Sequence, residues 1–128
     1  MEITVGMTGT VSTTVEREDT AYEVGSGSLL VYATPCMVAL MEGAACEAIA
    51  EAFGDDKTSV GIELNISHLS ATPVGLEVRA EAEVTEVDGN IITFHVAAYD
   101  EAGKIGEGTH KRAVVTAQRF LDKTYSKL

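Results

Sequence analysis

A single long helix is predicted in this chain, and it constrains the fold more than any other feature of the sequence. Thr34 can cap the free N–H groups at its start, and Pro35 suits the first helical position. The helix is expected over residues 35–53, and Gly54 ends it. Residues 36–41 are apolar on all sides, which is typical of a helix covered on most of its surface. The fold must therefore place this helix near its centre.

Most of the remaining sequence predicts β-strands, because apolar and polar residues alternate along it. The alternating segments are residues 3–15, 60–68, 74–84, 92–98 and 104–118. In the second segment one predicted face carries Val60, Ile62, Leu64 and Ile66, with His68 in phase. Between the first segment and the helix, the polar residues 16–28 are expected to form a loop.

Alternation with one apolar face is typical of antiparallel strands, and Asp88-Gly89-Asn90 is typical of a hairpin turn between two of them. Only the central helix is available to cover the apolar side of such a sheet. We therefore predict an α+β fold, a curved antiparallel sheet wrapped around one long helix, as a single domain over residues 1–128. The open sheet edges favour pairing with a second copy, so a homodimer is expected.

The composition excludes several classes of partner. Nine basic and twenty acidic residues give a net charge of −11, which argues against nucleic acid. No apolar run approaches the roughly 18 residues of a membrane span, and the first residues show no secretory signal, so no membrane association is expected. Cys36 and Cys46 would lie about 15 Å apart on the helix, too far for a disulfide, which favours a reducing cytoplasm.

The basic residues gather near the C-terminus. Residues 104–128 contain six basic residues and two acidic ones, whereas the preceding part of the chain is strongly acidic. Two interpretations stay open: solvated surface charge with a basic tail, or a local basic patch that binds a small anionic ligand.

Glu42 is the most unusual residue of the predicted helix. At 100° per residue, Val38, Cys46, Ile49 and Phe53 lie within about 40° of it, so Glu42 is expected at the centre of an apolar stripe. A carboxylate there is costly unless it is hydrogen-bonded, paired or neutral. Glu42 is either a catalytic carboxyl group or a structural one satisfied by neighbouring backbone or a buried arginine.

His68 and Thr34 are the other candidates for chemistry. His68 ends an apolar strand face, where a histidine is either a packed core residue or a group that meets the inward-facing Glu42. Thr34 is either a simple helix cap or part of an oxyanion site, since a helix N-terminus presents N–H groups to developing negative charge. Cys36 is expected to be a small buried residue rather than a reactive thiol.

Other familiar patterns are missing from the sequence. The three histidines, His68, His95 and His110, have no metal-ligand spacing with one another or with cysteine, so no metal site is expected. His95 is out of phase with its apolar neighbours and should be exposed. The glycine-rich stretches do not match a phosphate-binding loop.

Three segments, in this order, resemble the fluoroacetyl-CoA thioesterase family. They are residues 34–42 (TPCMVALME), residues 67–76 (SHLSATPVGL) and residues 106–113 (GEGTHKRA). The resemblance extends over nearly all of the chain from Tyr32 onward. It implies the hot-dog fold, a sheet wrapped on one helix, and a dimer.

The resemblance also implies roles for individual residues. A threonine at the helix start, a glutamate eight residues later and a histidine on the next strand form the family's catalytic group, and here these are Thr34, Glu42 and His68. A glycine whose backbone contacts the thioester matches Gly61, and a substrate-contacting arginine matches Arg112.

The function implied is hydrolysis of a short-chain acyl-CoA thioester to free acid and CoA, with CoA present only as part of the substrate and no separate cofactor. The alternative is a non-catalytic hot-dog protein that binds acyl-CoA or another small ligand. The segment before the helix carries only Tyr22 and Tyr32 as aromatics, and Gly43 stands where the family has a bulky aromatic. Selectivity for fluoroacetyl groups is therefore not carried over.

Overall fold

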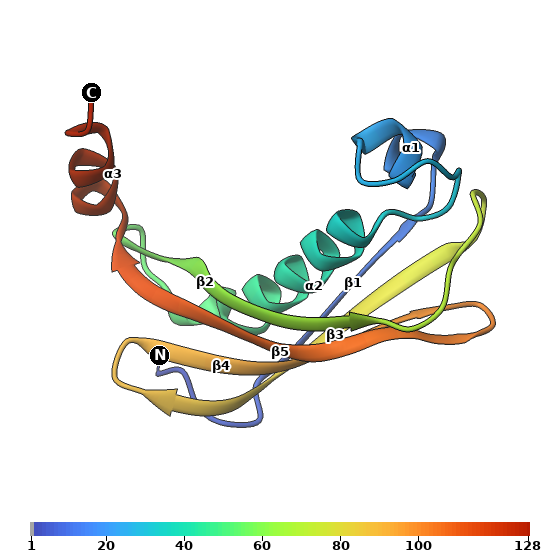
Figure 1. Cartoon of the computed structure of the whole chain (residues 1–128). Helices are drawn as coiled ribbons and strands as arrows, with labels where there is room; N and C mark the ends of the chain where they lie inside the picture. Colours follow the sequence, from blue (N-terminus) through green and yellow to red (C-terminus); the bar gives the residue numbers. More distant parts are fainter. Residues whose placement is uncertain (1) are drawn as a thin grey trace.

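The computed structural model describes residues 2–128, so Met1 of the predicted domain lies outside the described residues. Five antiparallel strands form one curved sheet, and a long helix, α2 (Thr34–Ile49), lies along its concave side (Figure 1). The sheet order is β1-β3-β4-β5-β2, with bounds β1 Thr8–Thr14, β2 Lys57–His68, β3 Glu77–Asp88, β4 Ile91–Asp100 and β5 Gly103–Thr116. This confirms the predicted α+β architecture.

Several element boundaries differ from the prediction. Helix α2 starts at Thr34, and a 3₁₀ turn over Ala50–Ala52 continues it toward the predicted end. Strand β1 begins only at Thr8, because the chain turns at Gly6, whose φ of 97° favours glycine. The segment predicted as a loop contains the 3₁₀ turn Arg17–Asp19 and the short helix α1 (Ala21–Val24). The last predicted strand ends at Thr116 and continues as helix α3 (Ala117–Tyr125).

The core lies between α2 and the concave face of the sheet. The predicted apolar positions on β3 and β4 are buried there, namely Val78, Ala80, Ala82 and Val84 with Ile92, Phe94, Val96 and Ala98. Facing them, α2 buries Met37, Met41, Ala44, Ala45 and Ile49. The pattern of alternation therefore predicted the inner face of these two strands correctly.

Strand β1 approaches α2 very closely at Gly9. A Cβ atom on this residue would collide with the backbone carbonyl of Ala44 and the backbone nitrogen of Ala48. Glycine is therefore required here by the distance between strand and helix rather than by a turn.

Strand β2 contains a β-bulge at Ile62, which changes the predicted face. Before the bulge Gly61 pairs with Arg112, and after it Leu64 pairs with His110, so residues 57, 59 and 61 share the inner face with residues 64, 66 and 68. Val60, which pairs with Ala113, points to the opposite side. The prediction of one continuous apolar face from Val60 to His68 was therefore wrong.

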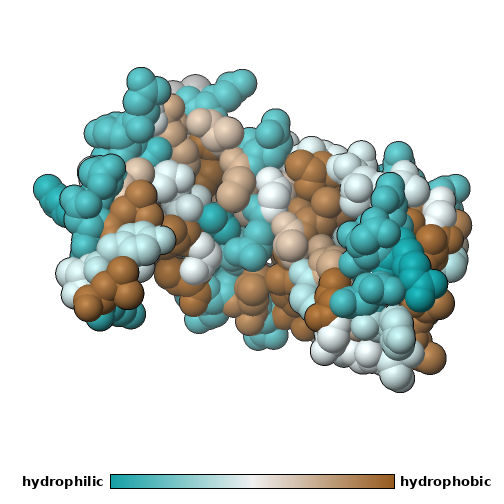
Figure 2. Space-filling model, turned by 90° about the horizontal axis from the view of Figure 1, so that it is seen from above, coloured by the Kyte–Doolittle hydropathy of each residue, from teal (hydrophilic) through white to brown (hydrophobic). Residues whose placement is uncertain are grey.

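Strand β2 is also an edge of the sheet, and α2 packs mainly on β1, β3 and β4. The apolar side chains Ile62 and Leu64 remain 52% and 45% exposed as a result. Figure 2, which views the concave side from above, shows hydrophobic patches between hydrophilic regions on this side. Within residues 2–128, no helix combines the length and the apolar character needed to cross a membrane.

Candidate active site

At the N-terminus of α2 the structure joins Thr34 to His68. Ala33, not Thr34, is the N-cap residue, and no side chain caps the helix there. The Thr34 hydroxyl instead lies 2.7 Å from His68 Nδ1. Simple capping by Thr34, one of the two interpretations of this residue, is therefore wrong. The pair lines an open pocket of about 320 Å³ together with Tyr32, Leu69 and Ser70.

The surroundings of His68 favour its neutral form. Desolvation by burial lowers the pKa of its imidazole, partly opposed by the backbone of Ser70. Its other ring nitrogen, Nε2, is buried and has no hydrogen-bond partner within residues 2–128. Buried polar atoms are nearly always satisfied, so this nitrogen beside the pocket makes His68 a candidate for chemistry.

A second centre lies farther along α2, around Glu42. Its Oε2 accepts a hydrogen bond of 3.1 Å from Arg112 Nη1. Arg112 is only 7% exposed, and two further hydrogen bonds fix its guanidinium, from Nε to the Ser59 hydroxyl at 2.8 Å and from Nη2 to the Ser59 carbonyl at 3.1 Å. The carboxylate therefore has a rigid cationic partner.

Glu42 does not lie at the centre of the buried stripe, as the helical periodicity predicted. The buried stripe of α2 runs through Met37, Met41 and Ala45, whereas Cys46 is exposed and the Glu42 side chain is 36% exposed. The prediction failed because the face of the helix that packs on the sheet is centred near Met41, about 100° around the helix axis from Glu42, although Ile49 of the predicted stripe is buried. Glu42 consequently lies at the border between the core and the uncovered inner face of β2.

His110 completes the surroundings of Glu42. It is 1% exposed, its Nδ1 lies 2.9 Å from the Glu63 carbonyl, and its Nε2 accepts a hydrogen bond of 3.1 Å from Arg112 Nη1. Nδ1 therefore carries the proton of the neutral ring and donates it to the carbonyl. Desolvation by burial lowers the pKa of His110, and the nearby Arg112 lowers it further. Arg112 thus bridges an imidazole and a carboxylate.

Gly61 lies directly under the Glu42 carboxylate. A Cβ atom at this position would stand 2.5 Å from Glu42 Oε2 and 3.4 Å from Arg112 Nη1. The absence of a side chain is therefore what allows the carboxylate and the guanidinium to meet above β2.

The predicted site residues thus form two groups in one chain. Thr34 and His68 meet at the start of α2, and Glu42, Gly61 and Arg112 meet about 12 Å farther along it, at eight residues of helical rise. Within residues 2–128, Glu42 makes its polar contacts with Arg112 and His110, and none of them is with His68.

Comparison with known proteins identifies the family. The model of the fluoroacetyl-CoA-specific thioesterase family matches residues 15–118. The chain belongs to this family. The fluoroacetyl-CoA thioesterase of Streptantibioticus cattleyicolor is 39% identical over 97 residues, which cover 76% of this chain and 70% of that protein.

Solved structures agree with the family assignment. The crystal structure of a fluoroacetyl-CoA thioesterase has a TM-score of 0.93 at 32% identity, and the match covers 100% of this chain and 99% of that one. A thioesterase superfamily member from Thermus thermophilus has a TM-score of 0.85 at 27% identity, with 99% and 98% covered. The predicted family, hot-dog fold and thioesterase class are therefore confirmed.

Sequence reasoning missed two residues that the fluoroacetyl-CoA-specific thioesterase fold brings to the Glu42 centre, His110 and Ser59. His110 stands two residues before Arg112 on β5, so the period of two already placed both side chains on one face. No sequence pattern placed Ser59 on the same face as His68, because the bulge at Ile62 shifts the alternation between them by one residue.

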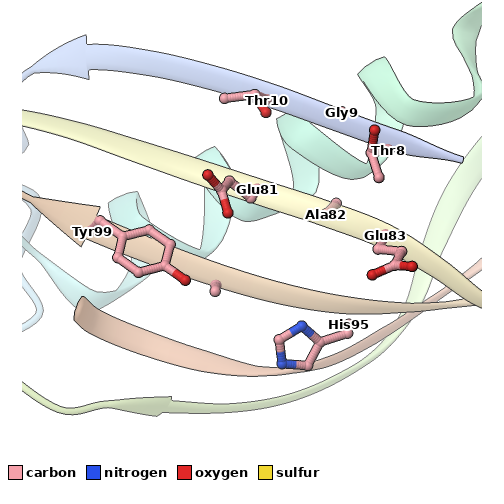
Figure 3. Close-up of a pocket in the computed structure, with 9 residues that line it drawn as sticks. Thr8, Gly9, Thr10, Glu81, Ala82, Glu83, His95 and Tyr99 are labelled. Atoms are coloured by element: carbon pink, nitrogen blue, oxygen red, sulfur yellow. The ribbon is translucent and has the colours of Figure 1, made fainter. Parts of the chain in front are cut away.

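A separate pocket of about 300 Å³ lies on the opposite face of this hot-dog sheet, lined by Glu81, Glu83, His95 and Tyr99 among others (Figure 3). Figure 3 shows these side chains on the strands, with α2 behind the sheet. His95 is exposed, as predicted, and its Nε2 lies 3.4 Å from Glu107 Oε2. Among residues 2–128, no three His, Cys, Asp or Glu side chains are grouped so that they could hold a metal ion.

Proposed function

We propose that this chain hydrolyses short-chain acyl-CoA thioesters, with Thr34, Glu42 and His68 as catalytic residues and Gly61 and Arg112 in contact with the substrate. The observation that carries the proposal is the Thr34–His68 hydrogen bond, which leaves His68 Nε2 buried and unpartnered at a pocket. One structure of the related fluoroacetyl-CoA-specific thioesterase, with a TM-score of 0.87, is described as a complex with fluoroacetate and CoA.

The chemistry follows from the two groups. The thioester oxygen accepts hydrogen bonds from Thr34 and from the Gly61 N–H, so its developing charge is stabilised. The Glu42 carboxylate either removes a proton from the attacking water or attacks the carbonyl itself. When His68 Nδ1–H donates to the Thr34 hydroxyl, Nε2 carries no proton, so it can receive the proton that the water loses and pass it to the departing thiolate as the C–S bond breaks. If Glu42 attacks the carbonyl itself, water then hydrolyses the acyl-glutamyl anhydride. Both routes consume one water and give the free acid and CoA. No metal or separate cofactor takes part.

We further propose that the working unit is a homodimer joined along β2. The edge is 12 residues long and carries the exposed side chains Ile62 and Leu64. An antiparallel register that sets Gly61 opposite the partner subunit's His68 would bring the two groups together, whereas about 23 Å of strand separates Gly61 from its own His68. Glu42 of one subunit would then act with the partner subunit's Thr34 and His68.

The reaction is tested with purified protein and acetyl-, propionyl- and longer acyl-CoAs, with released thiol as the readout. Glu42→Gln removes the charge at nearly constant shape, and we expect it to lower kcat at least a hundredfold on the best substrate. Wild-type rates in this variant would overturn the role of Glu42. Tight binding of CoA esters without turnover by the wild type would establish the alternative, a non-catalytic acyl-CoA binder.

The shared site is tested by mixing two inactive variants. In a heterodimer of Glu42→Ala and His68→Ala subunits, one composite centre keeps both its carboxylate and its imidazole, so about half of the wild-type activity per dimer should return. If both groups act within one chain, every centre lacks one of them and no activity returns.

We also propose a reducing, cytoplasmic setting. Cys36 and Cys46 are both free thiols and both lie on α2. Quantitative thiol labelling of protein isolated under rapid acid quench should find both reduced, and a cysteine oxidised in vivo would contradict the proposal.

A further inference from the structure

The basic residues of the chain divide into two sets. Four of the nine form ion pairs with acidic side chains, namely Arg17, Arg79, Lys104 and Arg112. The other five have no acidic partner within 4.0 Å among residues 2–128. Three of these five, Lys57, Arg119 and Lys123, line a single pocket of about 330 Å³. In a chain of net charge −11, such a concentration of uncompensated positive charge is unusual.

The pocket lies where α3 leaves the end of the sheet. Figure 1 shows α3 standing beyond the ends of β2 and β5, on the concave side of the sheet. Besides the three cations, the pocket is lined by the aromatic ring of Phe120, which is 42% exposed, and by Asn90. The one acidic residue of α3, Asp122, accepts a hydrogen bond of 2.8 Å from Gln118 and does not line the pocket.

The pocket and the Glu42 centre share one face of β2. Lys57 pairs with Thr116, Ser59 with Val114 and Gly61 with Arg112, so alternate residues lead from the carboxylate to the basic pocket. Four residues of strand separate Gly61 from Lys57, a distance of about 13 Å. Ser59 between them already holds Arg112.

We propose that this pocket binds the phosphorylated adenosine end of the CoA substrate, with Lys57, Arg119 and Lys123 at the phosphates and Phe120 against the base. The inference rests on the proposed thioesterase function and adds a subsite to it. The pantetheine arm has about the length of four extended residues, about 14 Å, which matches the distance of the pocket from the Glu42 centre. The acidic surface repels the CoA phosphates, whereas the three cations of this pocket attract them.

The test compares two thioesters that differ only in the nucleotide end, acetyl-CoA and acetyl-pantetheine. In the triple variant K57A/R119A/K123A, we expect kcat/KM for acetyl-CoA to fall at least tenfold relative to that for acetyl-pantetheine, mainly through KM. Salt should weaken the wild-type preference for acetyl-CoA in the same way. An unchanged ratio between the two substrates would overturn the proposal.

A matched control changes the net charge equally elsewhere. The triple variant R17A/R79A/K104A removes three cations that lie in exposed ion pairs away from the pocket, and it should keep the wild-type ratio. An equal fall in this control would assign the effect to total charge and also overturn the proposal. Thermal unfolding of both variants checks that they are folded.

Direct binding separates this inference from the proposed function. Calorimetry with free CoA and with 3′,5′-adenosine diphosphate needs no turnover. Binding by the wild type that weakens at least tenfold in K57A/R119A/K123A supports the subsite even if the protein hydrolyses no thioester. Absence of binding of both compounds by the wild type would refute it even if acetyl-pantetheine is hydrolysed.

Discussion

One nitrogen atom of Arg112 hydrogen-bonds to both Glu42 and His110. Its Nη1 lies 3.1 Å from both Glu42 Oε2 and His110 Nε2, and Ser59 holds the other side of the guanidinium. A neutral His110 can accept from the arginine, whereas a protonated one would repel it. The position of the Glu42 carboxylate thus depends on the protonation state of His110, although the two side chains share no hydrogen bond.

Replacing Gly61 by alanine should disable this arrangement. The new Cβ would stand 2.5 Å from Glu42 Oε2, so the carboxylate must rotate away from Arg112. We expect kcat/KM for the best acyl-CoA to fall at least tenfold, about 1.4 kcal/mol. Gly43→Ala on α2 is the control, because its Cβ would meet only Val11 at 3.8 Å and activity should be retained. Equal activity in both variants would contradict the role assigned to Gly61.

Stability should fall in mild acid because of His68 and His110. Burial lowers the pKa of both below the usual 6.5, so below about pH 6.5 the unfolded chain binds protons that the folded chain refuses. Above that pH both states are neutral and these residues add no pH dependence. Each histidine can lower the free energy of unfolding by at most about 1.4 kcal/mol per pH unit.

Urea denaturation between pH 8 and pH 5.5 measures this effect. His110→Gln keeps an acceptor for Arg112 and removes one titrating group, so its pH dependence should be shallower than that of the wild type. The same slope in both proteins would show that His110 does not contribute.

Among the elements, strand β1 and helix α2 show how a backbone contact determines a residue. Gly9 brings β1 against the backbone of Ala44 and Ala48, and no side-chain adjustment can make room for a methyl group there. A strand within residues 3–15 and the long helix were both predicted, but neither segment alone predicts how closely their backbones approach.

Gly9→Ala should therefore destabilise the protein by about 3 kcal/mol, in the upper range of overpacked cores. Chemical denaturation measures the change. Gly54→Ala serves as the comparison, because its Cβ would meet only the Asp56 side chain at 3.7 Å, and it should stay within about 0.5 kcal/mol of the wild type. A Gly9→Ala protein as stable as the wild type would mean that β1 can move away from α2 at little cost.

For the whole molecule, the distribution of exposed apolar residues matters most. Helix α2 covers β1, β3 and β4, and it leaves the inner face of the β2 edge open, where Leu64 is 45% exposed. The two halves of the candidate site border this same uncovered region. Assembly along β2 would bury it and bring the halves of two subunits together, which is the proposed reason why one chain alone holds them apart.

Leu64→Glu should separate the dimer, because a charge on the paired edge would be buried without a partner. Light scattering after size exclusion should show the wild type at twice the mass of one chain and the variant at the mass of one. Its kcat should fall at least tenfold with the loss of the composite site. Val5→Glu, at a residue 63% exposed outside the strands, should stay dimeric and active. A fully active Leu64→Glu monomer would refute the composite site.

Local pattern by itself determined the five strands, the long helix and the inner face of β3 and β4, because alternation and helical periodicity depend on neighbours in the chain. The resemblance of three short segments added the family and the site residues, since those positions carry chemistry that spacing alone leaves open. Helix α3 was missed because its nine residues follow β5 without a turn signal.

Only the tertiary structure decided how the site residues are grouped. The bulge at Ile62 reverses the phase of β2 and places Gly61 under Glu42, and one extra residue in a strand leaves no mark in a strictly alternating pattern. The flank of α2 that the sheet covers decided that Glu42 borders the core instead of lying within it. Both outcomes depend on contacts between segments that are distant in sequence, and local periodicity cannot predict such contacts.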